Sequence, residues 1–158
     1  MRYDVTLHNT PRRTALARRG KTWLETLDET IRTLTASLYP RAERHRLIPS
    51  GPPEVAYLSA FAPDVPLLIE ARLPVAGAER LRPGHQAPLV TLPPRRCAST
   101  VHHGAYDGIG AAYRALEEWV VEHRQRPVGP PTETYLVGPG ETDRVAEYRT
   151  EISIPVAG

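Results

Sequence analysis

The chain has 158 residues and an apolar content of 41%, enough for one packed core or two small fused modules. Its formal net charge is only +2, so it lacks the strong clustered positive charge of a dedicated nucleic-acid-binding protein. No apolar stretch reaches the length of a membrane span and no apolar signal segment begins the sequence, so we expect a cytoplasmic protein without a membrane partner. A single cysteine, Cys97, excludes an internal disulfide and a cysteine-built zinc site.

The first third of the chain predicts a strand, a connection and a helix. Residues 3–7 alternate between apolar and polar side chains, which is the period of a strand with one buried face. The arginine-rich segment 10–20 is expected to be a connection over the surface, because such a cluster is usually a solvated face. Thr22 and Glu25 have the T-x-x-E spacing of a capping box, and the helix that they begin keeps its apolar period until Pro40.

A charged loop over 41–50 leads to a predicted hairpin. Residues 54–61 and 67–75 are rich in branched and aromatic side chains, and an acidic, proline-containing turn separates them. The segment 76–88 contains glycine, proline and arginine and is the expected joint between two modules, while 89–92 is a candidate short strand.

The second half predicts the same order of elements. Residues 95–103 are expected to form a strand, followed by a helix that Asp107 caps and that ends before Pro127. Segments 132–137 and 145–155 predict the closing hairpin. The inward stripe of the second helix is expected to consist of Ile109, Ala112, Tyr113, Leu116, Val120 and His123.

The chain contains two related copies of one module. The octads 51–58 and 129–136 both begin Gly-Pro-Pro and end Tyr-Leu, and segments 69–75 and 150–156 are also similar to each other. The sequence therefore predicts an α+β fold in which two βαββ repeats form one antiparallel sheet, with two main helices on one face and a cleft between them. The boundaries expected within a single domain over 1–158 are 1–76 for the first repeat, 77–88 for the linker and 89–158 for the second repeat.

Glu133 occupies the position that Val55 has in the first copy. It shares one face of its strand with Tyr135 and Val137, and because its counterpart is apolar we expect the carboxylate to point inward. Burial of a carboxylate is costly unless its charge is compensated, and a cationic ligand can compensate it. The alternative is a glutamate on the solvent side or one paired with an arginine.

Aromatic side chains are concentrated in the second copy and can form the walls of a site for lipophilic cations. Stacking and cation–π contacts each contribute about 0.5–2 kcal/mol. The adjacent His102 and His103 point to opposite faces of a strand, and Cys97 has no evident base beside it, so we expect no metal and no cofactor. The residues expected to contact a ligand are Glu133, Tyr135, Trp119, Tyr148, Tyr106, Tyr113, Val55, Tyr57 and His102.

Several motifs of the second half occur in one order. The segment 102–107 reads His-His-Gly-Ala-Tyr-Asp, and the ending 151–156 reads Glu-Ile-Ser-Ile-Pro-Val. Between them stand Tyr113, Leu116, Trp119, Pro127, Gly129, Pro130, Glu133, Tyr135 and Leu136. This combination resembles the GyrI-like small-molecule-binding domains, also called AraC effector-binding or multidrug-binding domains, over essentially the whole chain.

The resemblance implies a fold of two SHS2 modules and an aromatic pocket for cationic, multidrug-like ligands. The glutamate at the bottom of that pocket is matched by Glu133, and its aromatic walls by Tyr135, Trp119 and Tyr148. Ligand-sensing transcription factors of this kind carry a helix-turn-helix domain in front, whereas this sequence begins at the binding domain. We therefore expect a stand-alone domain that does not contact nucleic acid directly and is a monomer or weak dimer.

Three functions are compatible with these residues. The first, which we favour, is a non-enzymatic binder of hydrophobic, often cationic aromatic compounds, with Glu133 as the counter-charge. The second, implied by the resemblance, is a metal-free hydrolase of strained electrophiles such as cyclopropane-bearing DNA alkylators, in which Glu133 is the general base and Tyr135 or Tyr106 polarises the leaving group. The third is a ligand-dependent adaptor that inhibits a larger protein such as a topoisomerase.

Overall fold

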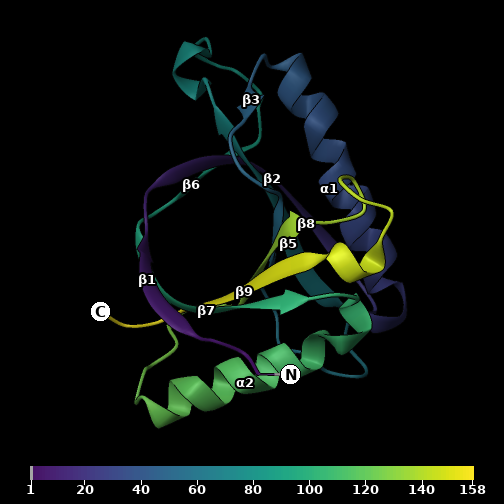
Figure 1. The fold of residues 1–158 in the computed structure, drawn as a ribbon. Helices are drawn as coiled ribbons and strands as arrows, with labels where there is room; N and C mark the ends of the chain where they lie inside the picture. The colour runs from purple at the N-terminus through teal and green to yellow at the C-terminus, as the bar shows by residue number, and fades with distance from the viewer. Residues whose placement is uncertain (1) are drawn as a thin grey trace. The chain divides into compact units, whose positions relative to one another are not determined.

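An antiparallel sheet with one main helix forms each of two structural units in the computed structural model, which describes residues 2–158 (Figure 1). Residues 12–93 make up one unit, and the segment up to Pro11 joins 94–158 to make up the other. The predicted α+β class with two main helices is confirmed. The predicted repeat boundaries concern sequence similarity and stay a prediction.

The unit 12–93 has the strand order β4-β5-β2-β6, and the short β3 pairs with β5. Its strands are β2 (Arg13–Thr22), β3 (Ile48–Pro49), β4 (Glu54–Tyr57), β5 (Leu67–Ala76) and β6 (Leu89–Leu92). The predicted hairpin is confirmed as the pair β4 and β5, in which Val55 lies opposite Ala71, although β4 ends at Tyr57 and not at 61. The candidate strand at 89–92 is confirmed as well, and it pairs with β2.

The prediction that residues 10–20 form a surface connection is wrong. Strand β2 occupies most of this segment and pairs with β5 on one side and β6 on the other. Ala15 and Leu16 are completely buried, while Arg13 and Arg19 reach buried glutamates of β4 and β5. The arginines therefore belong to a strand whose charge is balanced inside the sheet, and sequence alone does not show their partners.

Helix α1 (Leu27–Arg44) differs from its prediction at both ends. Thr22 does not cap it, because the Thr22 hydroxyl bonds the hydroxyls of Thr26 and Thr30 at 3.1 and 2.8 Å. The helix also continues through Pro40. Proline removes one helical hydrogen bond, but Leu38 and Ala42 on either side of it are almost fully buried, and this packing holds the last turn in place.

The other unit has the strand order β1-β7-β9-β8. Its strands are β1 (Thr6–Thr10), β7 (Arg95–His103), β8 (Thr132–Val137) and β9 (Arg149–Pro155). The predicted first strand begins at Thr6, later than expected, but its inward face is confirmed because Tyr3, Val5 and Leu7 pack against the core. The closing hairpin is confirmed as β8 and β9, but its second strand begins at Arg149 and not at 145, because Val145–Glu147 form a 3₁₀ turn.

Helix α2 (Ile109–Glu122) covers one face of this sheet. The core consists of Ala98, Ala112, Leu116, Val120, Ile152, Ile154 and Val156. The predicted stripe is confirmed except at His123, which is exposed just beyond the helix and stacks on Trp119. The predicted cap is wrong, because Asp107 lies in a 3₁₀ turn and Gly108 is the residue that precedes the helix. Neither helix within 2–158 is long and apolar enough to cross a membrane.

Candidate functional site

Glu133 is buried in β8, with only 7% of its surface exposed. Both carboxylate oxygens accept hydrogen bonds from phenols: the Tyr113 hydroxyl donates to Oε2 at 2.5 Å and the Tyr135 hydroxyl donates to Oε1 at 2.9 Å. Hydrogen bonds to a carboxylate are roughly twice as strong as those between neutral groups. The two tyrosines therefore fix the orientation of the carboxylate inside the unit.

Local structure brings these three side chains together. Tyr135 follows Glu133 by two residues in the same strand, so both side chains lie on one face of the sheet. Glu133 lies opposite Ile152 of β9, a member of the core that α2 covers, and α2 supplies Tyr113 from the same side. The carboxylate thus lies where the apolar core under α2 ends and polar side chains begin.

Two further tyrosines extend this group. The Tyr106 ring meets the Tyr135 ring edge to face with centroids 6.0 Å apart, and it lies 5.3 Å from the Tyr148 ring. The turn that presents Tyr106 depends on Gly104, whose φ of +103° favours glycine and whose N–H donates to the Tyr148 carbonyl at 2.8 Å. We call Glu133 with Tyr106, Tyr113, Tyr135 and Tyr148 the tyrosine cluster.

Trp119 lies apart from the tyrosine cluster. It follows Tyr113 by six residues along α2, or about 9 Å at the helical rise, and its ring stacks on His123 at 4.0 Å. Trp119 is partly buried against the core. Its predicted contact with a ligand stays a prediction.

His102 uses both ring nitrogens within the chain. Nε2 lies 2.8 Å from the Ala105 carbonyl, which can only accept, so Nε2 carries the proton; Nδ1 then accepts from the Tyr3 hydroxyl at 2.9 Å. His102 is buried and His103 is exposed, which confirms that they point to opposite faces. His102 therefore links the Ala105 carbonyl to the Tyr3 hydroxyl through hydrogen bonds. Its predicted contact with a ligand stays a prediction.

Val55 and Tyr57 belong to the unit 12–93. Both are buried in β4, on the face of the sheet that carries α1, and the Tyr57 ring lies 5.4 Å from Phe61. Their predicted role in ligand binding stays a prediction.

Thr150 is a buried residue that sequence reasoning missed. It lies in β9 directly opposite His102 on one side and Tyr135 on the other, and its exposed fraction is 0%. Its Oγ1 has no hydrogen-bond partner among residues 2–158. The sequence could have indicated this burial, because Thr150 alternates with Ile152 and Ile154 and therefore places a hydroxyl on the inward face of the strand.

Two other buried glutamates, Glu54 and Glu70, belong to an ion network on the sheet face opposite α1. Arg72 Nε lies 2.7 Å from Glu70 Oε1 and its Nη1 lies 3.7 Å from Glu54 Oε1. Arg19 also pairs with Glu70, at 2.8 Å, and Arg13 pairs with Glu54 at 3.3 Å. Burial alone would raise the pKa of Glu70, but the hydrogen bonds from Arg19 and Arg72 outweigh it and hold the pKa below its ordinary value. These glutamates therefore stabilise the sheet through arginines.

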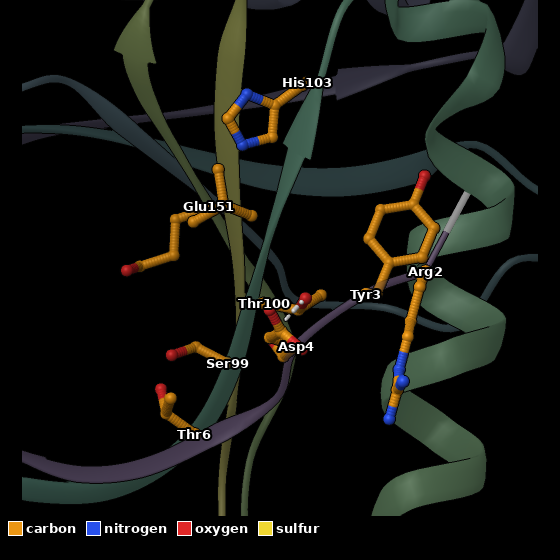
Figure 2. Close-up of a pocket in the computed structure, with 9 residues that line it drawn as sticks. Arg2, Tyr3, Asp4, Thr6, Ser99, Thr100, His103 and Glu151 are labelled. Atoms are coloured by element: carbon orange, nitrogen blue, oxygen red, sulfur yellow. Dashed lines mark hydrogen bonds between the residues drawn. The ribbon is translucent and has the colours of Figure 1, made fainter.

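A hollow of ≈ 460 Å³ opens along β1 and β7 in the unit that contains α2 (Figure 2). Figure 2 shows Ser99, Thr6 and Glu151 on one side of the strands and Tyr3 on the side of the helix. Glu151, Ser99 and His103 face away from the core that α2 covers, so this hollow is distinct from the tyrosine cluster. Its His103 is exposed to solvent, as expected of a hydrated surface groove.

Residues 15–157 match the model of the GyrI-like small molecule binding domain. No protein among the curated sequences gives a significant match. The EcmrR C-terminal domain superposes with a TM-score of 0.84 at 19% identity, covering 99% of each chain. In the complex of EcmrR with DNA, the match covers 98% of this chain and 57% of the EcmrR chain.

Two further structures share the fold at lower similarity. SAV2435 bound to tetraphenylphosphonium has a TM-score of 0.65 at 13% identity, with 98% of this chain and 94% of that chain covered. A hydrolase encoded by lin2189 from Listeria innocua has a TM-score of 0.64 at 12% identity, with coverages of 97% and 91%. Because the family model spans almost the whole sequence, the chain belongs to the GyrI-like small-molecule-binding domain family.

Proposed function

We propose that this protein binds hydrophobic aromatic cations at the tyrosine cluster, with the Glu133 carboxylate as the counter-charge. The observation that carries the proposal is a buried carboxylate oriented by two phenol hydroxyls, with further tyrosine rings beside it. Membership of a small-molecule-binding family supports the proposal.

The chemistry of the cluster favours a cation that is large and weakly hydrated. Attraction between opposite charges grows as the effective dielectric constant falls, so a buried carboxylate attracts a cation more strongly than an exposed one. Tyrosine faces add cation–π attraction of about 0.5–2 kcal/mol each. A lipophilic cation also loses little hydration on entry, whereas a neutral aromatic compound gains only stacking and burial.

Tetraphenylphosphonium is a suitable probe, since SAV2435 was solved with this ion. Isothermal titration calorimetry should show that tetraphenylphosphonium binds at least ~10-fold more tightly than neutral triphenylphosphine oxide, because only the cation gains the carboxylate and cation–π terms. Equal affinities for the two compounds, or no binding of the cation, would contradict the proposal.

A second candidate function, hydrolysis of a strained electrophile, uses the same groups. The 2.5 Å contact between the Tyr113 hydroxyl and Glu133, together with Tyr135, places proton donors beside a potential base. In this reaction Glu133 takes a proton from water, the water oxygen bonds to a ring carbon of a cyclopropane, and the released electron pair takes a proton from a tyrosine hydroxyl.

Mass spectrometry of a cyclopropane-bearing alkylator incubated with the protein distinguishes the two functions. The binding proposal expects the compound to be recovered intact from denatured protein. Hydrolysis instead expects a ring-opened product that has gained one water, formed by the wild type and lost in Glu133→Gln. A product that forms equally with the Gln variant would exclude Glu133 as the base.

A further inference from the structure

We propose that Thr150 is a second polar contact of the ligand site and donates a hydrogen bond to an oxygen or nitrogen acceptor on the bound cation. The inference rests on the proposed function, and it narrows the ligand class. It selects aromatic cations that carry a hydrogen-bond acceptor in addition to the charge.

Strand pairing places Thr150 between His102 of β7 and Tyr135 of β8, so the three side chains share the sheet face that α2 covers. Directly opposed residues in a sheet have Cβ atoms about 4.5–5.5 Å apart, which puts Thr150 beside a member of the tyrosine cluster. Glu133 lies opposite Ile152 and is therefore a diagonal neighbour of Thr150, about 7–8 Å away.

Thr150 is completely buried, and within residues 2–158 its Oγ1 has no partner. A buried polar atom left unsatisfied costs about 1–3 kcal/mol, and the large majority of such atoms are paired. On the β7 side, His102 already donates to Ala105 and accepts from Tyr3. A hydroxyl that finds no partner within residues 2–158 is free to donate to an acceptor that a ligand supplies.

Valine has nearly the volume of threonine and would fill an inward position of β9 without the unmet hydroxyl, as Ile152 and Ile154 do at the next inward positions. A polar residue that destabilises the free protein is expected where it contributes to binding.

Substitution of Thr150 tests the inference with two probes. Tetraphenylphosphonium has no hydrogen-bond acceptor, whereas rhodamine 6G is an aromatic cation with ester and ring oxygens. Thr150→Val is expected to weaken rhodamine 6G binding by ~10-fold while changing tetraphenylphosphonium binding less than about twofold, since only the dye loses a hydrogen bond. Thr150→Ser, which keeps the hydroxyl, should restore most of the dye affinity.

Thermal unfolding of the free variants gives a readout independent of ligand. Thr150→Val should unfold at the same or a higher temperature than wild type, because it removes a buried hydroxyl that has no hydrogen-bond partner within residues 2–158. Unchanged dye affinity in Thr150→Val, or parallel weakening of both probes, would overturn this inference and leave the proposed function standing. Failure of the wild type to bind either cation would overturn the proposed function and this inference together.

Discussion

Replacement of Glu133 by glutamine is expected to weaken tetraphenylphosphonium binding by ~30-fold or more, about 2 kcal/mol, the low end of what removing one charge from a buried pair costs. Glutamine keeps the shape of the side chain and can still accept a hydrogen bond from Tyr113 or Tyr135. The loss of affinity should therefore come from the missing charge. A calorimetric titration should show it as a weaker affinity at unchanged stoichiometry.

Two controls make the Glu133 result specific. Glu151→Gln removes a carboxylate from β9 on the opposite face of the same sheet, and it should leave the affinity for the cation unchanged. Triphenylphosphine oxide should bind wild type and Glu133→Gln alike, because a neutral ligand gains nothing from the charge. If Glu133→Gln binds the cation as tightly as wild type does, the counter-charge role is wrong.

Replacement of Arg72 by methionine is expected to destabilise the fold by about 1.5–3 kcal/mol at neutral pH, the range for losing a hydrogen bond to a charged group, because Arg13 and Arg19 still pair with its two glutamates. Arg72 contacts both Glu54 and Glu70, whose side chains are almost completely buried. Methionine fills much of the same volume as arginine. The loss of stability therefore comes chiefly from the two glutamate carboxylates, which stay buried but lose the cation that they share. Urea unfolding followed by circular dichroism measures the change.

The effect of Arg72→Met should depend on pH in a defined direction. Because the pKa of Glu70 is lowered in the folded state, its pairing stabilises the protein above the ordinary carboxyl pKa of about 4.3, and this contribution is lost as the pH falls through the folded-state pKa. The difference between variant and wild type should therefore shrink in acid. Arg144→Met is the matched control, since the Arg144–Glu147 pair is largely exposed and its loss should not be measurable. If Arg72→Met is less stable than wild type by the same amount at pH 7 and in acid, the electrostatic explanation is wrong.

Local pattern was sufficient for much of the unit that contains α2. The stripe of α2 and the hairpin of β8 and β9 follow from periods of two or 3.6 residues, which depend on neighbours in sequence. The local sequence pattern gave a wrong prediction where residues distant in sequence determine the structure. Strand β2 carries arginines that look solvated, yet Arg13 and Arg19 find their glutamates 41 and 51 residues away along the chain.

The sequence by itself predicted the α+β class and the burial of Glu133, because the copy-to-copy difference of Val55 and Glu133 is visible without coordinates, while the repeated module and the ligand-binding role of Glu133 stay predictions. Only the tertiary structure decided which groups surround the carboxylate. Tyr113 meets Glu133 from a helix 20 residues earlier, and Thr150 reaches the tyrosine cluster through the pairing of β9 with β7 and β8. Strand register and helix packing are set by the whole core, so the unmet hydroxyl of Thr150 becomes apparent only when its neighbours are in place.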